Sequence, residues 1–172
     1  ALVAESDAAD AEAREAVDLR KQHGWRIDAF GSGDAGPLGL LRDGVVSRFR
    51  ELPPAIAHAA AARLLGGGVH AWPVVDIVVS HAGVRGAIVD ALVAAGARGI
   101  VIAGTGNGTV HRELLQAAQR ARAAGVAVVR ASRCLGGGVF GATPDALPSH
   151  GGVTPWQARI ELLLDLMLAP QP

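Results

Sequence analysis

The chain has 172 residues, half of them hydrophobic, and its sixteen acidic residues balance sixteen basic ones. This length allows one substantial core, while the neutral balance and the lack of a basic run interleaved with aromatic residues argue against a nucleic-acid partner. No run of about 18 apolar residues predicts a membrane span, and the single cysteine, Cys134, excludes an internal disulfide.

The N-terminal third changes character along its length. Its first 20 residues are rich in alanine, aspartate and glutamate, a composition that favours a helix or a flexible acidic arm over a strand. Asp43-Gly44 then lies between two apolar runs, which predicts a small β-hairpin over about 38–49. We therefore expect a first part over 1–53, a linker over 54–73 that is rich in alanine and bounded by proline and glycine, and an α/β domain over 74–172.

The α/β domain is predicted from alternating strand and helix patterns. Apolar, β-branched runs predict strands over 74–80, 98–104 and 126–132. The intervening helical patterns end at Gly96 and Gly125, and a last helix is expected to begin at Thr154 as its N-cap, with Pro155 and Gln157 completing the capping signal. This alternation predicts the α/β class, with a small parallel sheet flanked by helices on both faces.

Ligands of open parallel sheets bind beyond the carboxyl ends of the strands. That edge is expected to collect Ser80-His81, the glycine loop 104–109, and the segment 132–134. The loop sequence GTGNGT offers backbone N–H groups that suit a carboxylate or phosphate. It departs from the dinucleotide fingerprint, whose third glycine would fall at Thr109, so we expect no nicotinamide or flavin cofactor. The alternative is a purely structural turn in which Thr109 is the helix N-cap.

Two residue types bear on catalysis. The six histidines show no metal-binding spacing, so no metal site is expected. Lys21 is the single lysine, and the other fifteen basic residues are arginines. An amine can lose its proton and act as a base, which a guanidinium cannot do at usable pH. Chance in an arginine-rich chain is the alternative explanation for Lys21.

Four motifs in chain order resemble the bacterial-type L-asparaginase family. They are AFGSGDAGPLG, VDIVVSHAG, the stretch RGIVIAGTGNGTVHRELLQAAQRARAAGVAVVRASRC, and GGVTPWQAR. The resemblance covers about residues 19–168. It implies the C-terminal domain of that family, preceded by the end of a larger α/β N-terminal domain whose remnant contains the hairpin.

The resemblance also implies an activity and a site. The family hydrolyses L-asparagine to L-aspartate and ammonia, in some members with glutaminase activity, through a threonine nucleophile and without a cofactor. Lys21 falls where the family has its catalytic lysine. The loop residues Asn107, Gly108 and Thr109 fall where the family approaches the substrate of a neighbouring subunit, which implies a homo-oligomer assembled as a dimer of dimers.

Several features depart from the family pattern. His81 replaces a usual aromatic residue, Arg85 stands near a frequent aspartate, and GGVFGATPDALPSH shortens an acidic stretch. The threonine motifs G-G-T-I and H-G-T-D-T do not occur in the sequence, so we expect the 172 residues alone to be inactive. The alternative is a catalytically inactive module that binds aspartate or asparagine.

Overall fold

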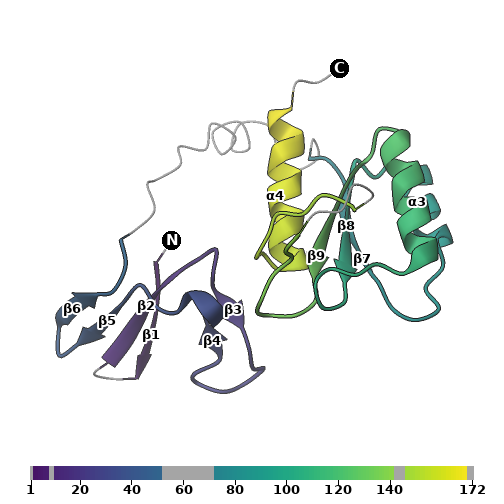
Figure 1. Cartoon of the computed structure of the whole chain (residues 1–172). Helices are drawn as coiled ribbons and strands as arrows, with labels where there is room; N and C mark the ends of the chain where they lie inside the picture. Colours follow the sequence, from purple (N-terminus) through teal and green to yellow (C-terminus); the bar gives the residue numbers. More distant parts are fainter. Residues whose placement is uncertain (1, 8–9, 52–71, 142–145, 170–172) are drawn as a thin grey trace. The chain divides into compact units, whose positions relative to one another are not determined.

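The structure is a computed structural model that describes residues 2–7, 10–51, 72–141 and 146–169 (Figure 1). The chain divides into two compact units, residues 1–56 and 57–172. The linker expected over 54–73 lies outside the described residues as far as position 71.

Unit 1 contains a four-stranded antiparallel sheet and a two-stranded ladder. The sheet has the order β1-β2-β5-β6, formed by Leu2–Asp7, Asp10–Glu15, Gly39–Arg42 and Val45–Arg48. The ladder pairs β3 (Arg20–Lys21) with β4 (Phe30–Gly31), and a short 3-10 helix, η1, covers Gly33–Ala35.

The expectation of a helix or flexible arm over the first 20 residues was wrong, because β1 and β2 form an antiparallel pair there. β2 also pairs with β5, so its backbone is hydrogen-bonded on both sides, and this pairing overrides the helix propensity of its alanine and glutamate residues. The side chains of Glu12 and Arg14 form an ion pair. Residues two apart share one face of a strand but not of a helix, so the Glu12–Arg14 contact is compatible with a strand and not with a helix.

The predicted hairpin over 38–49 is confirmed. Arg42 pairs with Val45 across a two-residue turn, and both turn residues have positive φ, 47° at Asp43 and 78° at Gly44. These angles are typical of the type I′ turn, whose twist matches that of the flanking strands.

Unit 2 confirms the predicted α/β class. Its sheet is parallel with the order β7-β8-β9, formed by Val75–Val79, Gly99–Gly104 and Ala127–Ser132. Its helices are α2 (Ala87–Ala94), α3 (Arg112–Ala123) and α4 (Pro155–Leu168). Each strand lies within one residue of the range expected from the sequence.

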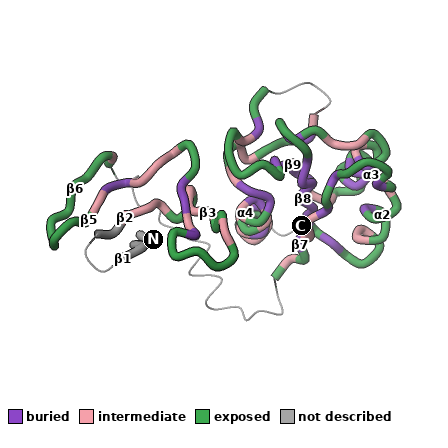
Figure 2. The backbone as a smooth tube through the Cα atoms, turned by 90° about the horizontal axis from the view of Figure 1, so that it is seen from below, coloured by how far each residue is buried: buried purple, intermediate pink, exposed green. Residues whose placement is uncertain are grey.

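Two apolar clusters cover the two faces of this sheet. Figure 2 colours the buried parts of these strands and helices purple. Ile100 and Ile102 of β8 pack with α2 and α3, and Val101 between them packs with α4. This alternation follows from the two-residue period of a strand. The central strand is thereby buried on both sides.

The helix ends follow the predicted signals. Gly96 has a φ of 89° just after α2, and the N–H of Ala97 reaches back to the carbonyl of Leu92, which completes a Schellman motif. At the start of α4, the Thr154 side chain accepts from the Gln157 backbone N–H, and the Gln157 side chain accepts from that of Thr154. This reciprocal capping box confirms the expected start of the helix.

Glu161 of α4 provides a pH test of this packing. Burial raises the pKa of its carboxyl above the ordinary 4.5, the attraction of His150 opposes the shift, and the nearby Asp165 adds to it. The folded state therefore binds this proton more tightly than the unfolded state. The resulting stability is present below pH 4.5 and is lost as the pH rises through the raised pKa.

We therefore predict that Glu161→Gln raises the free energy of unfolding relative to the parent chain more at pH 7 than at pH 4, as measured by urea titration. Glu113→Gln, at an exposed position of α3, is the control. A difference that is the same at both pH values would contradict the assignment.

Candidate functional site

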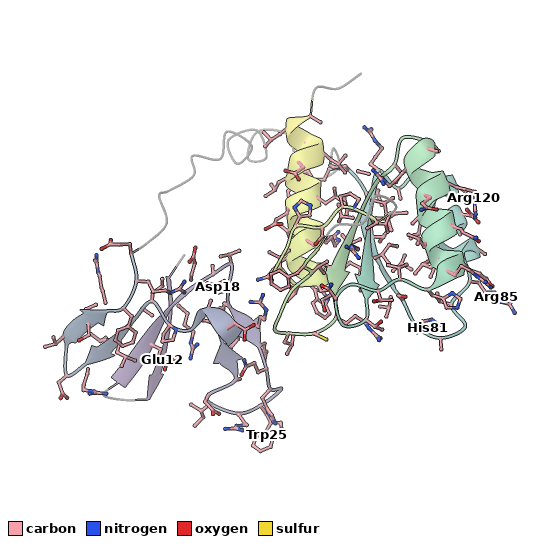
Figure 3. The ribbon with its side chains drawn as sticks, in the orientation of Figure 1. Glu12, Asp18, Trp25, His81, Arg85 and Arg120 are labelled. Atoms are coloured by element: carbon pink, nitrogen blue, oxygen red, sulfur yellow. The ribbon has the colours of Figure 1, made fainter. Side chains whose placement is uncertain are left out.

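The carboxyl ends of the three parallel strands meet as expected. The Ser80 hydroxyl, just after β7, accepts from the backbone N–H of His111 at 2.9 Å, which joins this strand end to the start of α3. The N–H of Arg133, just after β9, donates to the carbonyl of Gly104 at 2.9 Å. Figure 3 shows His81 and Arg85 at this same end of unit 2.

The glycine loop closes on itself. Thr105 and Thr109 exchange backbone hydrogen bonds of 3.0 and 2.8 Å, which leaves Gly106, Asn107 and Gly108 at the tip. Gly106 and Gly108 have φ values of 48° and 72°, in the left-handed region that favours glycine.

The helix after this loop begins later than it would if Thr109 were its N-cap. α3 starts at Arg112 with His111 as its N-cap, so Thr109 is not the cap and that expectation was wrong. The physical reason is the Thr105–Thr109 pair, which uses the Thr109 backbone to close the loop before the helix begins.

Close packing fixes the loop at its base and at its tip. A Cβ on Gly104 would lie 2.5 Å from the carbonyl carbon of Gly108, and a Cβ on Gly108 would lie 2.8 Å from Cγ2 of Val139. The loop therefore rests on the end of β8 on one side and on the segment 139–141 on the other.

Polar side chains join the same elements. The Asn107 amide donates from Nδ2 to the carbonyl of Phe140 at 2.7 Å and accepts at Oδ1 from the Phe140 N–H at 2.6 Å. The Ser132 hydroxyl donates to the Gly106 carbonyl at 2.5 Å, and Arg130 donates to the Gly141 carbonyl at 3.2 Å. The segment 139–141 was not among the residues expected at the site, since its glycine-rich sequence indicates only a turn.

Thr109 is the loop residue with a free polar group. Its side chain is exposed, and its hydroxyl makes no hydrogen bond with any other part of the chain that the structure describes. A hydroxyl can both donate and accept, so this position can meet a charged or polar ligand group. Cys134, a free and exposed thiol, lies nearby in sequence, and its backbone N–H donates to the Ser132 hydroxyl at 3.0 Å.

Lys21 lies in unit 1, on the two-stranded ladder opposite Phe30. Its side chain is exposed, and its Nζ lies 5.7 Å from the centroid of the Phe30 ring, within the range of a cation–π contact. The glycine loop, in contrast, belongs to unit 2.

Within residues 2–7, 10–51, 72–141 and 146–169, no group of three or more His, Cys, Asp or Glu side chains could hold a metal ion. No helix in that part of the chain is long and apolar enough to cross a membrane.

Residues 74–169 match the family described as the Glutaminase/Asparaginase C-terminal domain. The chain belongs to this family. The match covers the three-stranded sheet, its helices and the glycine loop, whereas Lys21 lies outside the matched residues.

The sequences of individual relatives agree with this family assignment. L-asparaginase 2 of Escherichia coli is 31% identical over 163 residues, covering 90% of this chain and 45% of the relative. L-asparaginase 2 of Bacillus subtilis is 36% identical over 158 residues, covering 90% and 41%. Glutaminase-asparaginase of Pseudomonas fluorescens is 35% identical over 121 residues, covering 70% and 33%. The chain thus spans less than half the length of these relatives.

A solved structure supports the same relationship. The crystal structure of a probable cytoplasmic L-asparaginase from Campylobacter jejuni has a TM-score of 0.79 and 28% sequence identity. The match covers 92% of this chain and 51% of that chain. The fold expected from the sequence is therefore confirmed.

The glycine loop gives a matched pair of substitutions. We predict that Gly108→Ala lowers the free energy of unfolding by more than Gly106→Ala, as measured by urea titration. Both alanines would adopt a positive φ, at a cost of about 1–3 kcal/mol, but only the Gly108 position is crowded by Val139. Equal losses would show that the contact with Val139 does not constrain the loop.

Proposed function

We propose that this chain is part of an L-asparaginase, which hydrolyses L-asparagine to L-aspartate and ammonia. The observation that carries the proposal is the family match over residues 74–169. Two L-asparaginases, 31% and 36% identical to this chain, extend the similarity to 90% of its length. In the proposed reaction a threonine hydroxyl attacks the amide carbon and ammonia leaves. Water then releases aspartate from the acyl-enzyme.

The glycine loop is the proposed substrate contact of this chain. Asn107, Gly108 and Thr109 form its tip and its closing residue, and the exposed Thr109 hydroxyl is the group free to meet the α-amino end of the substrate. The loop is packed at its base against the backbone of Gly108 and at its tip against the side chain of Val139, which supports a fixed geometry for that contact.

Lys21 is the proposed catalytic residue of unit 1. It is the single lysine of the chain, and its side chain is exposed on the β3–β4 ladder. We propose that its amine assists the activation of the nucleophile, a task that requires a group able to give up a proton.

The nucleophile itself is proposed to come from sequence that these 172 residues do not contain, since neither threonine motif occurs in them. The full active site would then form in a homo-oligomer, proposed to be a dimer of dimers, in which the glycine loop of one subunit meets the substrate of a neighbour. A catalytically inactive module that binds aspartate or asparagine is the second candidate, favoured by the same missing motifs.

We predict that the 172-residue chain releases no ammonia from L-asparagine above the buffer rate, as measured by a coupled assay, whereas the complete product of its gene does. Ammonia release by the short chain would contradict the placement of the nucleophile. If the complete product is inactive but binds L-aspartate saturably in calorimetry, the binding module replaces the asparaginase.

Lys21 is tested in the complete, active protein. We predict that Lys21→Arg lowers kcat for L-asparagine by about 100-fold or more, because arginine keeps the charge but cannot exchange the proton. Arg48→Lys, the reverse exchange at an exposed position on β6, is the control, since it also keeps the charge. A kcat for Lys21→Arg that equals that of the control would remove Lys21 from the mechanism.

A further inference from the structure

Asn107 is the loop residue whose side chain is already engaged. Its side-chain amide makes two hydrogen bonds with the backbone of Phe140. It donates to the Phe140 carbonyl at 2.7 Å and accepts from the Phe140 N–H at 2.6 Å. This pattern reproduces with a side chain the exchange that two paired strand residues make with their backbones. Both distances lie within the range of well-formed hydrogen bonds.

The segment that Asn107 holds has few other polar attachments. Val139 donates its N–H to the Gly151 carbonyl at 3.1 Å, and Arg130 donates to the Gly141 carbonyl at 3.2 Å. Within residues 2–7, 10–51, 72–141 and 146–169, the hydrogen bonds of the Phe140 backbone are those with Asn107. The Asn107 amide therefore sets the position of Phe140 relative to the tip of the loop.

The contact also acts on the loop. Asn107 lies between Gly106 and Gly108, two residues that accept a wide range of φ values. Without an attachment, a change in the backbone conformation of the tip would therefore cost little free energy. Ser132 fixes the Gly106 carbonyl on one side, and Val139 lies against Gly108 on the other. The amide of Asn107 is the attachment at the centre of the tip.

We propose that Asn107 is a positioning residue, which ties the glycine loop to Phe140 and so holds Thr109 in one geometry for the substrate. The inference rests on the proposed function and deepens it, because it assigns direct substrate contact to Thr109 and support to Asn107. The Phe140 ring, 70% exposed, is thereby held at the rim of the same loop.

The first test needs no activity. Hydrogen exchange of the Phe140 amide is measured by NMR in the 172-residue chain and in two variants. In Asn107→Ala the acceptor is lost, and we expect exchange at Phe140 to become about tenfold faster. In Asn107→Asp the carboxylate still accepts from the Phe140 N–H but faces the Phe140 carbonyl without a donor, so intermediate protection is expected.

Two controls separate this effect from general destabilisation. Gln116→Ala removes an exposed side-chain amide from α3 and should leave Phe140 unchanged. The amide of Ile102, in the buried central strand, should exchange equally in all variants. Unchanged exchange at Phe140 in Asn107→Ala would overturn the proposal.

The second test uses the complete, active protein. Loss of positioning should raise KM for L-asparagine about tenfold in Asn107→Ala, a change of about 1.4 kcal/mol, with kcat within about twofold of the parent. Gln116→Ala should change neither constant. If KM in Asn107→Ala matches that of the control, Asn107 does not position the substrate contact. If the complete protein shows no activity at all, the proposed function fails, and the exchange experiment still decides whether Asn107 holds Phe140.

Discussion

The structure of unit 2 depends on the burial of one strand between two cores. Ile100, Val101 and Ile102 of β8 are each 0% exposed, and they face alternate clusters under α2 and α3 and under α4. Fully burying such a side chain contributes roughly 1.5–3 kcal/mol. Because β8 is held on both faces, its end at Gly104 is a fixed point, and the glycine loop begins there.

That fixed point lets a glycine-rich loop keep one shape. Glycine removes the barrier to positive φ but also leaves the backbone free in the unfolded chain, so a loop of this composition needs attachments to be ordered. Three of the attachments here come from strand ends: Gly104 beneath the loop, Ser132 beside it, and Ser80 at the start of the following helix. The segment 139–141 supplies the others, through Val139 and Phe140. The loop is thus positioned by the sheet together with this segment.

The division into two units has a consequence for function. The candidate substrate contact, Thr109, lies in unit 2, and the candidate catalytic amine, Lys21, lies in unit 1. Neither unit carries the threonine motifs of the family. In the proposed oligomeric enzyme, the glycine loop of one subunit would complete the active site of a neighbouring subunit.

The sequence by itself determined the strands and helices of unit 2, the hairpin turn at Asp43-Gly44 and the family, because apolar periodicity, capping residues and glycine positions are local signals. It did not determine the strands β1 and β2, since the pairing of β2 with distant residues of β5, and of β1 with β2, outweighed local helix propensity. It also did not reveal the contact between Asn107 and Phe140, 33 residues apart. Only the tertiary structure decides such pairs, because a side-chain amide carries no local signal of the backbone group that it will meet.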